Sequence, residues 1–272
     1  MADASSLSDR FLALHRPGAP LLMPNPWDVG SARLLASLGF EALATTSSGY
    51  AATLGRLDGG ITRDEALAHA REIAAATALP VSADLEHGFG DAPEVVAETV
   101  ALACETGLAG CSIEDCSDGG ERRIYPHDLA VARVAAAAEA AQAGPQRLVL
   151  TARAENHIRG VDDLADTIAR LQAYEQAGAD VLFAPGLRTI EQIRAVVDAV
   201  QRPVNVLMLP GCPPVSELAA AGVARVSVGG GFAFAAIGTV VEAARELRED
   251  GTASYLERTT AGAAAARAAF RS

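Results

Sequence analysis

The sequence predicts an α/β barrel of the (β/α)8, or TIM, type with one extra helix at its C-terminus. Short apolar runs alternate with stretches of helical pattern, and glycine-containing joints such as Gly-Ala-Asp at 178–180 precede four of the runs. This alternation is typical of repeated βα units, whose strands form a parallel sheet. A chain of 272 residues is long enough for one barrel of eight units. The competing fold, a doubly wound sheet, is disfavoured because no glycine-rich dinucleotide turn follows the first run.

The apolar runs give the expected strands in chain order. They cover residues 20–25, 42–46, 80–85, 111–115, 148–154, 180–184, 204–209 and 225–228. Between them, residues 62–65 have the pattern of a capped helix start and residues 92–106 have helical apolar spacing. Gly107 and Gly178 stand where helices commonly end.

The C-terminal segment extends beyond the eight units. We expect the barrel to span residues 1–251 and a helical extension to span residues 252–272. Residues 252–270 are rich in alanine and apolar on more than one side of a helix, so this helix should pack on another surface. We therefore expect a homo-oligomer, a dimer or a tetramer, in which the C-terminal helix contacts a partner subunit.

The composition argues against several kinds of partner and compartment. The net charge of −12 disfavours a nucleic-acid partner, since binding to phosphates relies on clustered cations. No apolar run reaches the ~18 residues that a membrane-spanning helix needs, and residues 1–10 lack the pattern of a secretory signal. The four cysteines show neither metal-ligand spacing nor a disulfide framework. We therefore expect a cytoplasmic protein with reduced thiols and no membrane partner.

All 22 basic residues are arginine, and the chain contains no lysine. Schiff-base aldolase chemistry and lysine-bound pyridoxal phosphate are thereby excluded, because both need an amine nucleophile. The lysine of a phosphate-binding P-loop is missing too. A carbanion or enolate formed by this protein must therefore be stabilised by a metal ion or by arginine.

Three carboxylates follow two neighbouring strands of the expected barrel. Asp84 and Glu86 come at the end of the third run, at alternate positions that place both side chains on one side of a strand, and Glu114 ends the fourth run. Carboxylates gathered at the C-terminal ends of parallel strands repel one another unless a cation lies among them. Oxygen ligands without histidine or cysteine suit Mg²⁺ or Mn²⁺. The alternative is a solvated acidic rim at the mouth of the barrel.

Other polar residues also follow strand ends. Arg153 ends the fifth run, where it can bind a carboxylate through two N–H donors; alternatively it neutralises Glu155 or the acidic cluster. Residues 45–49 read Thr-Thr-Ser-Ser-Gly, whose backbone N–H groups can hold an anion but which is also an ordinary turn. Residues 116–125 are polar and contain two glycines and two arginines, and we expect a lid there that is poorly ordered or open without ligand.

Six short motifs occur in the order seen in the isocitrate lyase/phosphoenolpyruvate mutase superfamily. They stand at residues 25–33, 45–49, 54–60, 84–90, 113–115 and 151–153. The most specific are Asp-Leu-Glu-His-Gly-Phe-Gly at 84–90 and Ile-Glu-Asp at 113–115. On these motifs the chain resembles the superfamily over essentially its whole length. The resemblance implies a TIM-like barrel, Mg²⁺ or Mn²⁺, a substrate that passes through the enolate of a 2-oxo acid, and tetramers that exchange the terminal helix between partner barrels.

The resemblance also implies which residues bind metal and act in catalysis. The residues that match the metal shell, some of them acting through water, are Asp84, Glu86 and Glu114. Asp58 matches an aspartate that supports this shell. Arg153 and Asp58, together with Arg122 and Arg123 of the expected lid, are the candidate catalytic residues.

The predicted substrate-binding residues come from several matched segments. Arg153 matches the arginine that binds the oxo acid, and Asn205 matches a polar residue near the far end of the substrate. The backbone amides of residues 47–49 match those that hold the substrate carboxylate. The full predicted set is Trp27, Thr45, Ser47, Ser48, Gly49, Arg153 and Asn205.

Two segments depart from the carbon–carbon lyases of the superfamily. Those lyases carry Lys-Lys-Cys-Gly-His after Ile-Glu-Asp, whereas residues 116–123 read Cys-Ser-Asp-Gly-Gly-Glu-Arg-Arg. The lyases also place a glutamate after Phe-Pro near the sixth strand, where residues 183–186 read Phe-Ala-Pro-Gly. The loop of the mutases, with its lysine and asparagine, is missing as well. These departures argue against efficient cleavage of isocitrate or methylisocitrate.

The sequence thus predicts a Mg²⁺-dependent enzyme that acts on a small 2-oxo or 2-hydroxy di- or tricarboxylic acid. It would cleave a carbon–carbon bond of this acid, or decarboxylate it, through an enolate. Two alternatives remain open. Phosphorus–carbon chemistry on phosphonopyruvate, of hydrolase or mutase type, would use cations such as Arg122 or Arg123 around a phosphonyl group. A non-catalytic 2-oxo-acid-binding protein would account for the altered loop.

Overall fold

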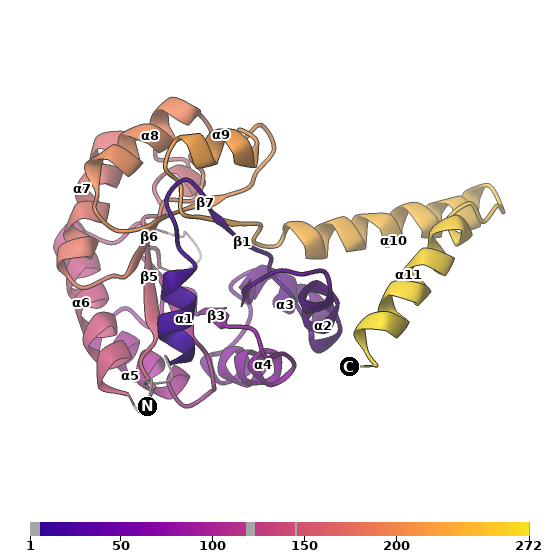
Figure 1. The fold of residues 1–272 in the computed structure, drawn as a ribbon, viewed down its shortest axis with the longest axis horizontal. Coiled ribbons are helices and arrows are strands. Elements are labelled where there is room, and N and C mark those ends of the chain that lie inside the picture. Colours follow the sequence, from indigo (N-terminus) through magenta and orange to yellow (C-terminus); the bar gives the residue numbers. More distant parts are fainter. Residues whose placement is uncertain (1–5, 118–122, 145, 272) are drawn as a thin grey trace.

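Eight parallel strands in the described part of the chain form a nearly closed barrel, which confirms the predicted fold (Figure 1). The computed structural model describes residues 6–117, 123–144 and 146–271. The strands are β1 (Leu21–Met23), β2 (Leu43–Ala44), β3 (Val81–Asp84), β4 (Gly110–Glu114), β5 (Val149–Arg153), β6 (Val181–Phe183), β7 (Val204–Leu207) and β8 (Arg225–Ser227). Their hydrogen-bonded order is β1-β8-β7-β6-β5-β4-β3-β2. The amide of Ala44 donates to the carbonyl oxygen of Pro24 (3.1 Å), which joins β2 to the end of β1.

The helices between the strands cover the outside of the barrel. They are α2 (Val29–Ser37), α3 (Ser47–Thr53), α4 (Arg63–Ala75), α5 (Pro93–Ala103), α6 (His127–Ala143), α7 (Leu164–Gln176), α8 (Ile190–Ala199) and α9 (Val215–Ala220). The capped start predicted at 62–65 is confirmed, because Thr62 and Glu65 each accept a hydrogen bond from the other's backbone amide. The Thr-Thr-Ser-Ser-Gly segment leads directly into α3, since Thr46 Oγ1 caps this helix by accepting from the amide of Gly49 (3.3 Å).

A short N-terminal helix, α1 (Leu7–Ala13), closes the barrel at the starts of its strands. Its Phe11 is fully buried and belongs to a cluster with Ala109, Val149 and Val181, which stand at or just before the first residues of β4, β5 and β6. The side chain of His15, just after α1, reaches the interior of the barrel. Helix α1 therefore forms the base of the barrel, opposite the C-terminal strand ends.

The interior of the barrel is partly polar. Bulky branched side chains fill the interior of most barrels of this type, but Thr151, Asn205, Arg225 and Ser227 are all buried here. The guanidinium of Arg225 donates to Asn205 Oδ1 (2.9 Å) and to Thr151 Oγ1 (3.1 Å). It also lies 3.1 Å from Nε2 of His15. A buried hydrogen-bonded group thus joins α1 to three strands.

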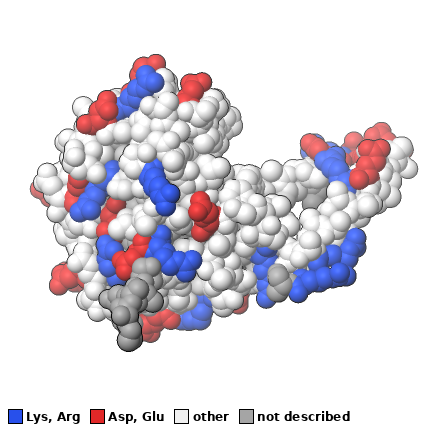
Figure 2. Space-filling model, in the orientation of Figure 1, with Lys and Arg blue, Asp and Glu red and all other residues white. Residues whose placement is uncertain are grey.

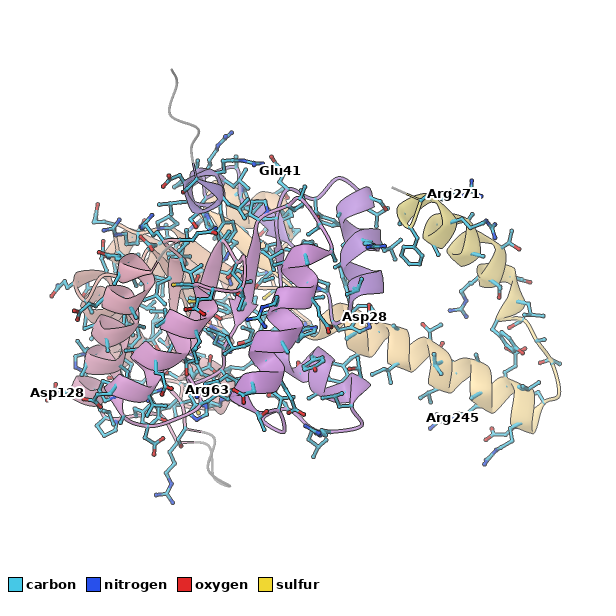
Figure 3. The ribbon with its side chains drawn as sticks, turned by 90° about the horizontal axis from the view of Figure 1, so that it is seen from below. Asp28, Glu41, Arg63, Asp128, Arg245 and Arg271 are labelled. Carbon is cyan, nitrogen blue, oxygen red and sulfur yellow. The ribbon has the colours of Figure 1, made fainter. Side chains whose placement is uncertain are left out.

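The last two helices form an arm that projects from the barrel (Figures 1 and 3). They are α10 (Gly231–Glu249) and α11 (Leu256–Ala269). The projecting part therefore begins within the segment that the sequence assigned to the barrel, and the extension helix begins at Leu256 rather than at 252. The end of α11 returns to α2 of the same chain, where Ala269 is buried and the Phe270 ring lies close to Gly30.

The first half of α10 carries large apolar side chains on its surface. Phe234, Ile237, Val240 and Val241 are 41–67% exposed. Figure 2 shows the upper part of the arm free of charge next to the barrel, acidic side chains gathered at its tip, and basic side chains at the tip and along its lower edge. None of the described helices combines the length and the apolar character that a membrane crossing requires.

The buried position of His15 predicts a pH dependence of stability. The Phe11 carbonyl oxygen lies 2.9 Å from Nδ1, and burial, followed by the nearby charge of Arg225, lowers the pKa of His15 from 6.5 to about 3. The unfolded chain therefore binds one more proton than the folded protein between these values, so stability falls as the pH drops below about 6.5. For this one group the loss between pH 7 and pH 5 is about 2 kcal/mol. We expect His15→Gln to remove that part of the loss, as measured by urea unfolding at both pH values.

His127→Gln is the matched control, because His127 lies at the exposed start of α6 and contacts Asp128. It should keep the pH dependence of the wild-type protein. Equal dependence in wild type and His15→Gln would contradict a buried, neutral His15.

Candidate functional site

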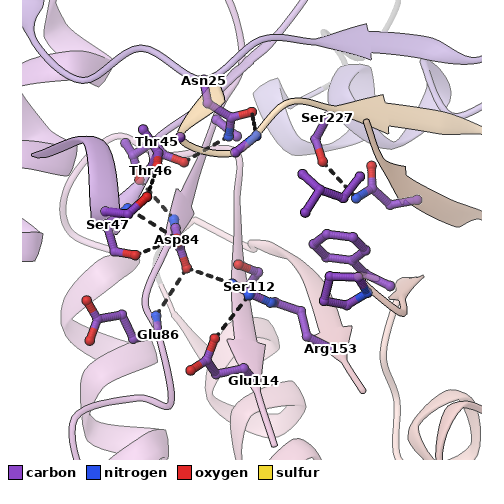
Figure 4. A pocket seen from close by; sticks show the side chains of 18 of the residues that line it. Asn25, Thr45, Thr46, Ser47, Asp84, Glu86, Ser112, Glu114, Arg153 and Ser227 are labelled. Carbon is purple, nitrogen blue, oxygen red and sulfur yellow. Dashed lines mark hydrogen bonds and ion pairs between the residues drawn. The ribbon is translucent and has the colours of Figure 1, made fainter. Parts of the chain in front are cut away.

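A cavity of about 230 Å³ opens at the C-terminal ends of the strands (Figure 4). Its walls come from all eight strands or the segments that follow them. The polar residues that line it are Asn25, Thr45, Thr46, Ser47, Ser48, Asp58, Ser82, Asp84, Glu86, Ser112, Glu114, Arg153, Glu155, Arg159, Asn205, Arg225 and Ser227. The C-terminal face is where barrels of this type hold their active sites.

Arg153 holds the acidic wall of this cavity together. Its guanidinium lies 3.0 Å from Asp84 Oδ1, 3.0 Å from Glu114 Oε2 and 2.9 Å from Glu155 Oε1. The barrel register explains the arrangement, because Glu114 and Arg153 are paired neighbours on β4 and β5. The ring of Phe183 on β6 lies 5.4 Å from the guanidinium carbon and covers its other side. Arg153 thus neutralises the acidic cluster, which is one of the two roles that the sequence left open for it. It also lines the cavity, where it could bind a carboxylate.

The charges at the mouth of the cavity do not balance. Among the described residues, the acidic side chains there are Asp58, Asp84, Glu86, Glu114 and Glu155, and the arginines beside them are Arg153 and Arg159. Burial, with Glu155 as the next cause, raises the pKa of Glu114. Burial opposes the charge of Arg153, but Glu155, Glu114 and Asp84 outweigh it and raise the pKa of Arg153. The site retains an excess of negative charge that a further cation would reduce.

Asp84 is oriented by the segment that follows β2. Its Oδ2 accepts hydrogen bonds from the amide (3.2 Å) and the hydroxyl (3.0 Å) of Ser47, and its own amide donates to Thr45 Oγ1 (2.9 Å). The Ser47 hydroxyl is also 3.2 Å from Asp58 Oδ1. Asp58 therefore lies beside Asp84 through a shared serine, which fits the predicted supporting position.

The loop that carries Glu86 is held by an arginine that sequence reasoning missed. Glu86 and Phe89 adopt left-handed backbone conformations (φ 50° and 61°), which non-glycine residues rarely adopt without support from their surroundings. Arg133 on α6 donates to the carbonyl oxygens of Gly90 (2.6 Å), Asp91 (2.5 Å) and His87. The sequence does hold one sign of this role. Arg133 lies among alanine and valine on the face of α6 that is buried, which indicates a buried arginine that needs partners.

Not every predicted binding residue lines the cavity. Asp58, Asp84, Glu86, Glu114, Thr45, Ser47, Ser48, Arg153 and Asn205 do. Trp27 and Gly49 instead line a second, apolar hollow against α10. Gly49 packs closely there, because a side chain at this position would meet Thr46 and Ala233. The amides of Ser47 and Gly49 donate to Asp84 and Thr46 in this structure, and their predicted role in holding a substrate carboxylate stays a prediction.

Only the two ends of the predicted lid, residues 116–117 and 123–125, belong to the described residues. Arg122 and residues 118–121 lie outside the described residues. At its base, Cys116 and Ile124 pair as a short antiparallel bridge, and the amide of Ser117 donates to the carbonyl oxygen of Arg123 (2.9 Å). Arg123 is exposed and does not line the cavity in this arrangement.

The cavity fits the predicted hard metal ion in its donor chemistry. Asp84 and Glu114 approach the same guanidinium, and Glu86 follows Asp84 on the same wall. Within the described ranges, no three acidic, histidine or cysteine side chains are close enough to hold an ion by themselves. Mg²⁺ commonly uses one or two carboxylates and keeps several waters. Asp84, Glu86 and Glu114 are thus suited to hold Mg²⁺ in part through water.

Cys116 is not placed to react with a ligand in the cavity. It is fully buried, it does not line the cavity, and burial raises its pKa to about 11. Because Cys116 does not reach the cavity, we expect Cys116→Ser to keep kcat within a few-fold of wild type. Loss of a proton donor would instead lower turnover by about 10²–10⁴. A fall of that larger size on the same substrate would show that Cys116 takes part in proton transfer.

Comparison with known proteins supports the resemblance seen in the motifs. The family model described as phosphoenolpyruvate phosphomutase matches residues 11–248. The 2-methylisocitrate lyase of Escherichia coli (strain K12) is 32% identical over 211 residues, which cover 71% of this chain and 70% of that enzyme. The oxaloacetate decarboxylase of Paraburkholderia xenovorans (strain LB400) is 35% identical over 199 residues, which cover 70% of this chain and 64% of that enzyme.

A solved structure gives a stronger match to the whole fold. The crystal structure of a provisionally named lyase/mutase from Burkholderia cenocepacia J2315 is 53% identical to this chain, with a TM-score of 0.92. The match covers 96% of this chain and 95% of that one. The similarity therefore includes the C-terminal arm as well as the barrel.

Proposed function

This chain belongs to the phosphoenolpyruvate phosphomutase family, and from that premise we propose that it is a Mg²⁺- or Mn²⁺-dependent carbon–carbon lyase. Its substrate is a small 2-oxo or 2-hydroxy di- or tricarboxylic acid, which it cleaves or decarboxylates through an enolate. The relatives named 2-methylisocitrate lyase and oxaloacetate decarboxylase support the two forms of this reaction. Four free cysteines accord with a cytoplasmic location as part of the same proposal.

The observation that carries the proposal is the contact of Arg153 with Asp84, Glu114 and Glu155 at the cavity wall. An arginine fixed on three sides needs little reorganisation when a substrate carboxylate arrives, so it can orient the oxo acid. Asp84, Glu86 and Glu114 would hold the ion, and Ser47 and Asp58 would keep Asp84 in place. When bound, Mg²⁺ supplies a Lewis acid that stabilises the negative charge of the enolate.

Phosphorus–carbon chemistry is the less favoured reading. It was expected to use Arg122 or Arg123 at a phosphonyl group, and Arg123 does not line the cavity. The relatives named 2-methylisocitrate lyase and oxaloacetate decarboxylase support carbon–carbon chemistry on a carboxylic acid.

Metal removal and a substrate panel test this proposal together. We expect Mg²⁺-dependent turnover of at least one of oxaloacetate, isocitrate, methylisocitrate, 2,3-dimethylmalate and phosphonopyruvate, with a carboxylic acid preferred over phosphonopyruvate. Exhaustive EDTA treatment should abolish this turnover, and added Mg²⁺ or Mn²⁺ should restore it, because carboxylates alone cannot stabilise an enolate.

Circular dichroism of the chelated protein is the control, since the barrel should stay folded. Arg153→Met should lose turnover in the presence of Mg²⁺, whereas the exposed Arg188→Gln should not. Full activity after chelation would refute the metal-dependent mechanism. Preferred turnover of phosphonopyruvate would favour the phosphorus–carbon reading, and tight binding of 2-oxo acids without turnover would favour a binding protein.

We also propose that the arm contacts a second copy of the chain. Ala233, Ile237, Val240 and Val241 of α10 line the apolar hollow together with Trp27. Exposed apolar side chains gathered on one helix commonly mark a protein interface. A homodimer or homotetramer would cover this surface and would bring a partner's residues close to α3.

Sedimentation velocity tests the assembly. We expect wild type to sediment as a dimer or tetramer and Ile237→Glu/Val240→Glu to sediment as a smaller species, because a charge buried without a partner strongly disfavours the interface. Arg245→Gln, an exposed change on the same helix, should not alter the distribution. A wild-type protein that stays monomeric at micromolar concentration would contradict the proposal.

A further inference from the structure

The β7–β8 side of the cavity contains a buried arginine with no acidic partner. Arg225 is only 2% exposed, yet it lines the cavity. Its hydrogen-bond partners are Asn205, Thr151 and His15, all of them neutral groups. Among the described residues no carboxylate lies within ion-pair distance of it, in contrast to Arg153, which contacts three.

This isolation has an electrostatic cost. Burial alone lowers the pKa of Arg225 to about 9, which still leaves the guanidinium charged at neutral pH. A buried charge without a counter-ion is strongly disfavoured, and an anion brought next to it recovers much of that cost. None of the described residues supplies such an anion, whereas a ligand that reaches the floor of the cavity can.

Arg225 also sets the direction of the hydrogen bonds around it. A guanidinium can only donate, so Oδ1 of Asn205 must be the atom that faces it (2.9 Å). The amide nitrogen of Asn205 then donates to Ser227 Oγ (3.0 Å). Because Ser227 accepts this bond, its own hydroxyl proton is available to the cavity. The groups that this row of hydrogen bonds presents to the cavity, the Arg225 guanidinium and the Ser227 hydroxyl, are therefore donors. Donors bind an anion in preference to a neutral or cationic group.

The donor group lies across the cavity from the acidic wall. Figure 4 shows Ser227 on the opposite side of the pocket from Glu86 and Glu114. On β5, the partner of Arg225 is Thr151, and Arg153 stands two residues further along the same strand, roughly 7 Å away. This separation is comparable to the length of a short dicarboxylate. One carboxylate at Arg153 would leave the second one near Arg225.

We propose that Arg225, Asn205 and Ser227 form an anion subsite that takes the second carboxylate of the substrate and selects dicarboxylates over monocarboxylates. This inference rests on the proposed function for the position of the first carboxylate. Arg225 supplies the charge of the subsite, and through Asn205 it directs the Ser227 hydroxyl toward the ligand. Thr151 and His15 hold the guanidinium from the far side.

Calorimetry with a pair of ligands tests the subsite in the Mg²⁺-loaded protein. Oxalate is short and reaches only the Arg153 end, whereas 3,3-difluorooxaloacetate is longer and has no C3 hydrogen to lose. We expect Arg225→Gln to weaken binding of 3,3-difluorooxaloacetate by about 10- to 100-fold, the range for loss of a charged hydrogen-bond partner. Binding of oxalate should change by no more than about twofold, since the two ends are independent sites.

Three further variants separate a role in binding from a role in folding. Arg225→Lys keeps the charge and should recover part of the difference between the two ligands. Ser227→Ala, which leaves Arg225 in place, should weaken only 3,3-difluorooxaloacetate, and it carries the test if Arg225→Gln does not fold. Arg188→Gln, an exposed change before α8, should alter neither ligand. Equal losses for both ligands, or no loss for either, in Arg225→Gln and Ser227→Ala would overturn the proposal.

Failure of the proposed function gives a different result. If wild type binds no oxalate in the presence of Mg²⁺, the proposed metal and first-carboxylate site at Arg153 is wrong. Binding of bromide then tests the Arg225 subsite independently. We expect crystals grown in bromide to show an anomalous peak beside Arg225 and Ser227 in wild type and none in Arg225→Gln. The absence of this peak in wild type would then overturn the subsite as well.

Discussion

The contact of one guanidinium with three carboxylates organises the candidate active site. Asp84, Glu114 and Glu155 come from the ends of β3, β4 and β5, and without Arg153 they would repel one another in a buried place. Arg153 makes their approach possible, but the wall keeps an excess of negative charge. The same interaction therefore stabilises the barrel mouth and leaves it ready for a divalent cation. In a chain without lysine, the charge of an enolate must be stabilised by arginine or by a metal ion.

Most of the fold could be predicted because its signals are local. A strand that is buried on both sides reads as a short apolar run, and a polar residue at its end marks the functional face of a parallel barrel. Asp84, Glu114 and Arg153 were found in this way, and all line the cavity. Trp27 was placed by its motif alone. A motif gives the neighbourhood of a residue but does not show that its side chain points toward α10 rather than into the cavity.

The residues that were missed depend on contacts between distant parts of the chain. Arg133 supports the Glu86 loop through carbonyl oxygens more than 40 positions away; the helical pattern of α6 places Arg133 on the buried face but does not show these partners. Arg225 opens a short run of β character, and a strand signal does not show that its side chain is buried without an acid. The direction of α10 was also unpredictable, because an amphipathic helix that packs on its own barrel has the same pattern as one that packs on a neighbour.

The position of His15 and Arg225 bears on how the protein folds. These residues are 210 positions apart, yet they meet beneath the cavity. Helix α1 precedes the strands in the chain, but Nε2 of His15, just after this helix, meets Arg225 only when β8 has joined the sheet. Contacts of such long sequence separation form slowly, because the entropy of the intervening chain must be lost first. The floor of the cavity is therefore complete only when the first and last parts of the barrel have come together.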